Sequence, residues 1–548
     1  MTTRSPWGAL LRCWMPALLA LVVMDGCGDD DEETGPAQGT GGVDAGSDAK
    51  NDTSTGGTDA ASDATSDLSE DATDASTDSE PDADEDVAPT AACQNCHSTI
   101  ATRLSAGAHK ALPEGCVGCH KNGFDHQANP ASVKASIEFT IHGCAGTCHQ
   151  EYETSYLKDD GIKAGSYGGS VKTSKYLEFP AYKHLMGGHG FTLEYNEDRA
   201  HAFMLKDHRE IARKQNVVCL QCKSTPIAYY FNEQRRGEYP FSTAMTWDNA
   251  VKSITDNWGA TLDYGASCNH CHDPHGATFR LVRKAQLEAI LERGTDPYGA
   301  TNFYPKTSAE LFAKMNEKGT DGKLTPEARR LAGTLTCAQC HVEYTCGPGI
   351  DKDKGILRDD FPWRKLRDIE DYYKVKYNTV QDWKHSGTGL PGIKAQHPET
   401  EFFWESKHYA SGVACIDCHA AKTATGTSHF FSSPFKDPQG HCGKCHAGDY
   451  AQRVTTVKGW QDQVWNQAKT VETSLDQVLT KIEALASDPN FDGQKLLEAK
   501  QLYMRALLWW EFTIVSENST GAHNPAEAKT NLDTATTDLG KAKTLLGL

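Results

Sequence analysis

Cys337-Ala-Gln-Cys340-His341 is one of six copies of the pattern Cys-x-x-Cys-His in this chain of 548 residues. The pattern is typical of c-type haem attachment: two thiols bond the porphyrin, and the histidine that follows binds its iron. Chance predicts only about 0.03 copies at this composition. A zinc site has no use for a histidine after each cysteine pair. The copies are Cys93, Cys96 and His97; Cys116, Cys119 and His120; Cys268, Cys271 and His272; Cys337, Cys340 and His341; Cys415, Cys418 and His419; and Cys442, Cys445 and His446.

Two further cysteine pairs depart from this pattern. Cys144 and Cys148 enclose three residues before His149, a loop that still reaches both vinyl groups. Cys219-Leu-Gln-Cys222-Lys223 has lysine where histidine belongs. An amine binds iron only when it is deprotonated, so burial or the metal must lower the pKa of Lys223. We expect eight haems; the alternatives at Lys223 are a site without haem and a haem held by a remote histidine.

Histidines outside the motifs are numerous enough to close the other haems. A haem that only carries electrons takes two strong axial ligands, so seven such haems need seven more histidines. Each candidate could also be an ordinary surface or hydrogen-bonding histidine, and the sequence does not pair any of them with a haem. The candidates are His109, His126, His142, His184, His189, His201, His208, His408, His429 and His523.

The first 27 residues predict an export signal. Arg4 and Arg12 precede a short apolar run that is too short to span a bilayer. The run ends in Met24-Asp25-Gly26-Cys27, which resembles a bacterial lipoprotein cleavage site. We expect an extracytoplasmic, periplasmic protein with a lipid anchor on Cys27. The alternative is an ordinary signal peptide.

Residues 28–90 differ in composition from the rest of the chain. They hold twenty acidic residues and one lysine, Lys50. The net charge of this segment therefore equals the formal charge of −19 for the whole chain. With almost no large apolar residue, the segment cannot bury enough surface to fold, and we predict a disordered linker. Because the net negative charge lies in this linker, it does not indicate a charged binding surface on the folded part. We expect no nucleic-acid partner.

The remaining sequence divides into three parts. Residues 91–180 hold three haem motifs and predict an N-terminal trihaem domain, whereas residues 181–450 hold five and predict a catalytic pentahaem core. In residues 451–548 apolar positions recur every three or four residues, which predicts long helices. Asp488 and Asn524, each followed by proline, are expected to cap the second and third.

The expected fold is therefore mainly α-helical, with a core packed by haem, little β-structure and long C-terminal helices. The second of these helices is rich in leucine and tryptophan. Its apolar face can pack on the chain's own core or against another copy. We favour a homo-oligomer, because this face is too apolar for solvent alone.

Three motifs around Lys223 resemble the cytochrome c nitrite reductases, pentahaem enzymes that form ammonia. The motifs are the segment with Arg199 and His201, Cys340-His-Val-Glu-Tyr344, and Ile393-Lys-Ala-Gln-His-Pro-Glu399. Ala200 replaces the family's glycine but leaves the arginine in place. The resemblance runs from about residue 180 to the end of the chain.

Two departures from the pentahaem pattern resemble the octahaem nitrite reductases. Three extra haem sites precede the core, and Cys346 lies two residues after Tyr344. In the octahaem enzymes such a tyrosine and cysteine are covalently linked. The resemblance thus implies a role for Cys346, which no haem motif uses.

The resemblance implies six-electron reduction of nitrite to ammonium at the Lys223 haem. Arg199, Tyr344 and His397 would form its distal pocket. A permanently charged arginine suits an anion, and a histidine donates protons near neutral pH. Hydroxylamine and sulfite are further expected substrates, and a small cytochrome c or a quinol-linked redox protein is the expected donor.

The resemblance also implies a Ca²⁺ site and part of the haem ligation. Oxygen donors suit this ion. Its expected ligands are the Glu343 side chain, the carbonyls of Tyr344 and Lys394, and the Gln396 side chain. His201, His408, His429 and His523 match distal ligands of the family, and we expect His189 and His208 to serve the added N-terminal haems, with His184 beside them.

Two other functions stay open. Octahaem tetrathionate-reducing proteins also use a lysine-ligated haem, although the motifs of Arg199, Tyr344 and His397 speak against them. A multihaem electron conduit on a lipid anchor would have only closed haems. Lys223 separates the conduit from an enzyme, because a conduit needs no haem with an open face.

Overall fold

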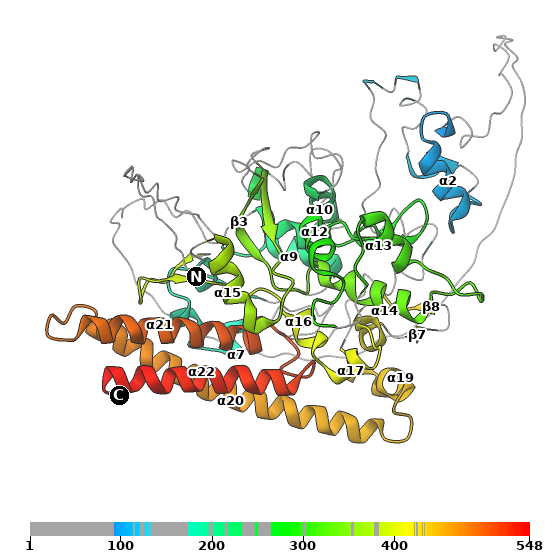
Figure 1. The fold of residues 1–548 in the computed structure, drawn as a ribbon. Helices are drawn as coiled ribbons and strands as arrows, with labels where there is room; N and C mark the ends of the chain where they lie inside the picture. The colour runs from blue at the N-terminus through cyan, green and yellow to red at the C-terminus, as the bar shows by residue number, and fades with distance from the viewer. Residues whose placement is uncertain are drawn as a thin grey trace, which may run out of the picture.

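The computed structural model describes residues 93–112, 115–120, 125, 128–129, 131–132, 149, 174–196, 201–213, 217–232, 247–249, 252, 265–299, 303–351, 356–377, 383–420, 422–423, 426–429, 431 and 433–548. The expected export signal and acidic linker lie outside these residues. Within them, the chain is mostly helical (Figure 1). No helix of this described part is long and apolar enough to cross a membrane.

Three long helices at the C-terminus lie side by side along one edge of the molecule (Figure 1). They are α20 (Tyr450–Leu485), α21 (Gly493–Trp510) and α22 (Pro525–Leu546). Asn524 caps α22 as expected, because its side chain accepts the Glu527 N–H. The cap of α21 is Asp492 and not Asp488, whose carboxylate instead accepts the Asn490 N–H in the preceding turn. The prediction of long C-terminal helices is confirmed.

The apolar face of α21 is covered by the chain itself. Trp510 is fully buried, and its indole N–H donates to the carbonyl of Ala468 in α20 at 3.0 Å. Leu507 and Leu508 are buried in the same cluster, which α20 and α22 complete. The apolar character that suggested oligomerisation is therefore explained within one chain, and the homo-oligomer stays a prediction.

A π-helical turn, Glu511–Val515, continues α21 beyond Trp510. Its hydrogen bond runs from the Ser516 N–H to the Glu511 carbonyl, five residues back. Such turns occur often at functional sites. Here the turn places Glu511 and Ser516 in the interior, where both are fully buried.

Short helices and turns make up the rest of the described chain, with a second apolar cluster among α12, α14 and α16. The helices are α2 (Ser98–Ala106), α3 (Gly115–Cys119), α7 (Lys175–Glu178), α8 (Tyr182–Leu185), α9 (Met204–Arg209), α10 (Thr225–Asn232), α12 (Lys284–Arg293), α13 (Ser308–Met315), α14 (Pro326–Leu335), α15 (Leu366–Tyr377), α16 (Glu399–Trp404), α17 (Lys407–Ala410), α18 (Cys415–His419) and α19 (Pro438–His441).

The strands of the described residues form four antiparallel pairs of two strands each. Little sheet was expected, and this is confirmed. The pairs are β1 (His272–Asp273) with β2 (Thr278–Phe279), β3 (Thr345–Asp351) with β4 (Ile356–Asp360), β5 (Trp383–Lys384) with β6 (Pro391–Gly392), and β7 (Lys422–Thr423) with β8 (Gly426–Thr427).

Candidate functional site

Each described haem motif folds as one tight turn. In the motif that opens with Cys337, the N–H of Cys340 donates to the Cys337 carbonyl at 3.2 Å, and the His341 N–H donates to the same carbonyl at 3.0 Å. The motifs that open with Cys93 and Cys442 repeat both bonds. Such a turn places both thiols on one side, with the histidine directly after them, which is the arrangement that haem attachment needs.

Pairs of imidazoles test whether haem fits this chain. A metal–nitrogen bond is about 2 Å long and a ring centre lies about 1.1 Å from its nitrogen, so imidazoles on opposite sides of one iron have centres about 6.3 Å apart. Six motif histidines each lie at this spacing from another histidine, and His341 lies at it from two, His201 and His397. The pairs are His149 with His109 (6.2 Å), His120 with His275 (6.2 Å), His272 with His429 (6.4 Å), His341 with His201 (6.2 Å), His419 with His523 (6.2 Å) and His446 with His408 (6.5 Å).

The second nitrogen of several paired rings meets an oxygen acceptor, as iron-binding histidines require. His523 Nδ1 lies 2.6 Å from the buried Glu517 carboxylate, and His109 Nδ1 lies 2.7 Å from the Pro274 carbonyl. His275 Nδ1 lies 3.3 Å from Asp273. These contacts occupy Nδ1 and leave Nε2 as the nitrogen available to a metal, so the residues fit a haem held by two histidines.

The sequence-based reading did not include His275 among the ligand candidates. Its one signal is position: it lies three residues after His272, too close to reach the opposite side of the same iron. A histidine in that place is available to a neighbouring haem. The ring that it faces, His120, belongs to the N-terminal segment and is far away in the sequence.

Two of the expected distal ligands lie beside the C-terminal helices. The ring nitrogens of His184 are 2.7 Å from Asp476 and 3.2 Å from Glu483. His189 is buried and stacks on Phe191 at a ring separation of 4.9 Å. Their role as ligands stays a prediction that this placement does not support, because carboxylates and apolar rings surround them.

The remaining predicted residues are only partly described. Cys346 lies in β3, without a described side chain, and His208 is half-buried in α9. His97 is exposed and precedes α2. The predictions for His126, His142, Cys144, Cys148 and Arg199 fall outside the described residues.

Cysteines of different motifs lie in contact. The thiols of Cys222 and Cys340 share a hydrogen bond, and so do those of Cys337 and Cys415. In the loaded protein these sulfur atoms would be thioethers at the porphyrin edges. These contacts bring the attachment motifs of Lys223, His341 and His419 next to one another.

The surroundings of Lys223 include a buried phenol and a buried cation. Tyr344 is 4% exposed, and burial, with the charge of nearby thiols, raises its pKa well above the usual value. Arg283 is fully buried; its Nη1 lies 2.6 Å from the Cys222 sulfur, and its guanidinium lies 5.5 Å from the centre of the Tyr344 ring. A protonated phenol and a fixed positive charge therefore border this motif.

His397 lies near the same region. Its ring centre is 6.4 Å from that of His341, the motif histidine next to the Lys223 site. Two contacts hold the segment before it. Lys394 Nζ lies 3.3 Å from the Glu511 carboxylate, with both side chains buried. The Ser516 hydroxyl donates to the Ala395 carbonyl at 2.9 Å. The π-helical turn thus supports the segment that carries His397.

The expected calcium ligands converge as well. The Gln396 N–H donates to the Glu343 carboxylate at 2.7 Å, and the Gln396 amide lies 3.3 Å from the Lys394 carbonyl. Glu343 is fully buried. These are the hard oxygen donors that Ca²⁺ takes, so the residues fit the ion. No cluster of three His, Cys, Asp or Glu side chains suited to a metal occurs in the described part, and the expected site would use carbonyls instead.

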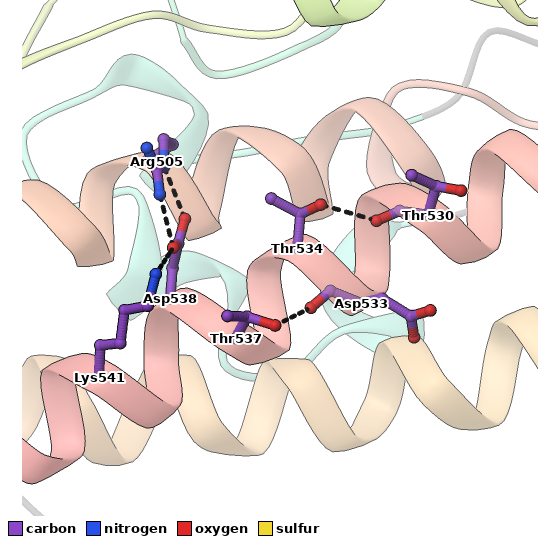
Figure 2. A pocket seen from close by; sticks show the side chains of 7 residues that line it. All are labelled: Arg505, Thr530, Asp533, Thr534, Thr537, Asp538 and Lys541. Carbon is purple, nitrogen blue, oxygen red and sulfur yellow. Dashed lines mark hydrogen bonds and ion pairs between the residues drawn. The ribbon is translucent and has the colours of Figure 1, made fainter.

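A shallow pocket of about 350 Å³ lies far from the motifs, between α21 and α22 (Figure 2). Arg505 forms a two-pronged ion pair with Asp538, with both contacts at 2.6 Å. The threonine hydroxyls that line the pocket donate to carbonyls of their own helix. Because these polar groups are satisfied within the bundle, the pocket presents little to a ligand.

Comparisons with known proteins agree with this geometry. A family model described as cytochrome c552 matches residues 146–548. Cytochrome c nitrite reductase subunit NrfA of Nitratidesulfovibrio vulgaris strain Hildenborough is 28% identical over 429 residues, covering 69% of this chain and 73% of that protein. Cytochrome c nitrite reductase from Desulfovibrio desulfuricans ATCC 27774, solved with two calcium sites in its catalytic subunit NrfA, is similar with a TM-score of 0.59 and 26% identity, covering 75% of this chain and 86% of that one.

Proposed function

This chain belongs to the cytochrome c552 family, and from that premise we propose that it is an octahaem nitrite reductase that converts nitrite to ammonium at the haem of Lys223. The observation that carries the proposal is the lysine motif next to Tyr344, with His397 beside the adjoining motif histidine. Closed haems of an electron conduit would need neither the lysine nor a pocket of proton-donating groups.

The haem would supply an iron with one open face and a route for electrons. The reaction takes six electrons and eight protons, breaks both N–O bonds and releases two waters with the ammonium ion. The chain must therefore deliver protons and hold an anion. The imidazole of His397 is a group that can donate protons, and Tyr344 stays protonated because burial raises its pKa.

Positive charge at the site favours an anionic substrate. Arg283 lies beside Tyr344 and the Cys222 sulfur, and by its motif Arg199 adds a second guanidinium. Fixed cations in a site with little water stabilise the negative charge that develops as the N–O bonds break. A covalent bond from Tyr344 to Cys346, as in the octahaem enzymes, would also fix the phenol ring.

The supply of electrons follows from the number of haems. Eight attachment motifs would store enough electrons for a complete reduction without release of intermediates. The contacts of Cys222 with Cys340, and of Cys337 with Cys415, support a continuous row that ends at Lys223. Bound Ca²⁺ at Glu343 and Gln396 would hold the His397 segment in place.

The same chemistry extends the range of substrates and fixes the place of action. Hydroxylamine and sulfite also present a lone pair to iron and accept electrons, so we include both as substrates. We also propose that the protein works outside the cytoplasm on a lipid anchor at Cys27, with a small cytochrome c or a quinol-linked redox protein as its donor; the predicted export signal and covalent haem attachment support the extracytoplasmic location.

Ligand titration of the fully loaded protein tests the proposal. Nitrite or cyanide should perturb the absorption spectrum of one haem among eight. Lys223→His should keep all haems attached, because the thioether bonds remain, and should lower nitrite turnover at least tenfold, about 1.4 kcal/mol of barrier. If no haem of the unmodified protein binds either ligand, the protein is a conduit.

A further inference from the structure

Residues 273–276 follow the motif histidine His272; they span the end of β1 and most of the turn to β2, and we call them the 273–276 turn. This turn contacts the N-terminal segment through each of its residues. Asp273 forms an ion pair with Arg103 at 3.1 Å, and the Pro274 carbonyl lies 2.7 Å from His109 Nδ1. The contacts of the other two residues are those of His275 with His120 and of Gly276 with Gly107.

The two chain segments approach closely at the glycines. A Cβ on Gly107 would lie 2.7 Å from the Cα of Gly276, closer than side-chain carbons come to backbone atoms. Only glycine at position 107 permits this approach. The end of α2 and the 273–276 turn therefore fit each other at backbone level, in addition to the ion pair.

The turn also aims its histidine at an N-terminal motif. Asp273 Oδ1 lies 3.3 Å from His275 Nδ1, so Nε2 is the nitrogen left to face His120. The two ring centres are 6.2 Å apart with planes inclined by only 19°, the spacing at which one iron fits between them. His120 is the motif histidine of Cys116 and Cys119.

The neighbouring backbone carbonyl orients a second ligand. His109 lies 6.2 Å from His149, the histidine of the third N-terminal motif, and the Pro274 carbonyl holds its other nitrogen. One turn of the core thus supplies a ring to one N-terminal haem and positions a ring for another.

We propose that the 273–276 turn completes the haem site of Cys116, Cys119 and His120 by providing His275 as its second axial ligand. The N-terminal segment and the core then share one chain of haems. His275 and His272, which bind neighbouring haems, are three residues apart, so their Cα atoms are at most about 11 Å from each other. With both haems bound, this short separation would suit electron transfer between the two sites, with an external reduced protein as the source of the electron.

The inference rests on haem attachment and not on the choice of substrate. It is therefore tested by spin state, which magnetic circular dichroism counts per chain in the oxidised, fully loaded protein. His275→Ala should add one high-spin haem, raising the number from one to two, a twofold change, with all haems still attached by mass. Added imidazole should fill the vacated position and bring the count of the variant to that of the unmodified protein measured with the same imidazole.

Arg103→Gln is the matched control, because it breaks the ion pair at the same turn and removes no imidazole. It should leave the high-spin count unchanged. An unchanged count in His275→Ala would overturn the ligand assignment, and so would an equal rise in both variants, which would indicate loosened docking. If the Lys223 haem is itself low-spin, the proposed function fails, but His275→Ala should still add one high-spin haem.

Discussion

Glu517 is a single residue that bears on the reduction potential of one haem. It is fully buried, and its carboxylate takes both the His523 ring, at 2.6 Å, and the Ser519 hydroxyl, at 2.9 Å. His523 in turn faces His419. A negative charge on the far side of an axial imidazole increases electron density at the iron, and this stabilises the oxidised state.

Glu517→Gln should therefore raise the reduction potential of the Cys415 haem. A loss of about 1 kcal/mol of differential stabilisation corresponds to a shift on the order of 50 mV for one electron. Spectroelectrochemical titration of the loaded protein measures it. Glu498→Gln neutralises an exposed carboxylate of α21 and serves as the control for a general change of charge of the same sign. A shift to lower potential would contradict the argument.

His184 gives a prediction about pH. Partial burial disfavours its charged ring, but hydrogen bonds to Asp476 and Glu483 outweigh this and raise its pKa above the usual value. A raised pKa in the folded state means that the contribution to stability is complete below about pH 6.5 and is lost as the pH rises through the folded value.

His184→Gln should thus lower the melting temperature near pH 6 and not near pH 9. The loss in the free energy of unfolding should stay below about 1 kcal/mol, because the ion pairs are partly exposed. Thermal unfolding followed by circular dichroism at both pH values checks this. Equal losses at both would argue against the charge effect. A new high-spin haem in this variant would restore His184 to the ligand role expected from the sequence.

At the scale of elements, α21 depends on Trp510. Its side chain is completely buried, at 0% exposure, between α20 and the residues around Phe179 and Tyr182. Trp510→Ala should lower the free energy of unfolding by about 3–5 kcal/mol through the cavity it leaves. Urea unfolding followed by far-ultraviolet circular dichroism measures this loss.

Trp460→Ala removes the same side chain from a position that is 37% exposed and should cost clearly less. Similar losses for the two tryptophans would mean that the C-terminal face is covered by another copy of the chain. The comparison therefore also tests the expected homo-oligomer.

Local patterns in the sequence predict what depends on neighbours along the chain. The turn of each haem motif, the cap at Asn524 and the apolar spacing of α20 are all of this kind. Contacts between distant segments escape such patterns. Nothing in the sequence joins His275 to His120, separates His184 from the histidines that lie in ring pairs, or shows that α20 covers Trp510. The cap of α21 is Asp492 and not Asp488. Both aspartates are suitable cap residues, so the local sequence does not decide between them.

At the scale of the whole molecule, the number of haems is the quantity on which the assignment as an octahaem enzyme depends. The intact mass of the exported protein should exceed that of the processed polypeptide by eight haems. A Tyr344–Cys346 bond should lower it further by two hydrogens. A mass that fits five haems would mean that the three N-terminal motifs carry no haem and take no part in electron transfer. Haem staining after denaturing electrophoresis confirms that attachment is covalent.

The buried contact between Lys394 and Glu511 means that the protein can keep its haems and still lose the structure of its active site. Thioether bonds keep haem on the polypeptide whether or not the chain is folded. The His397 segment, by contrast, depends on the π-helical turn through Lys394, Glu511 and Ser516. A preparation whose C-terminal helices have come apart would remain red and yet be inert, so its colour is no measure of its competence.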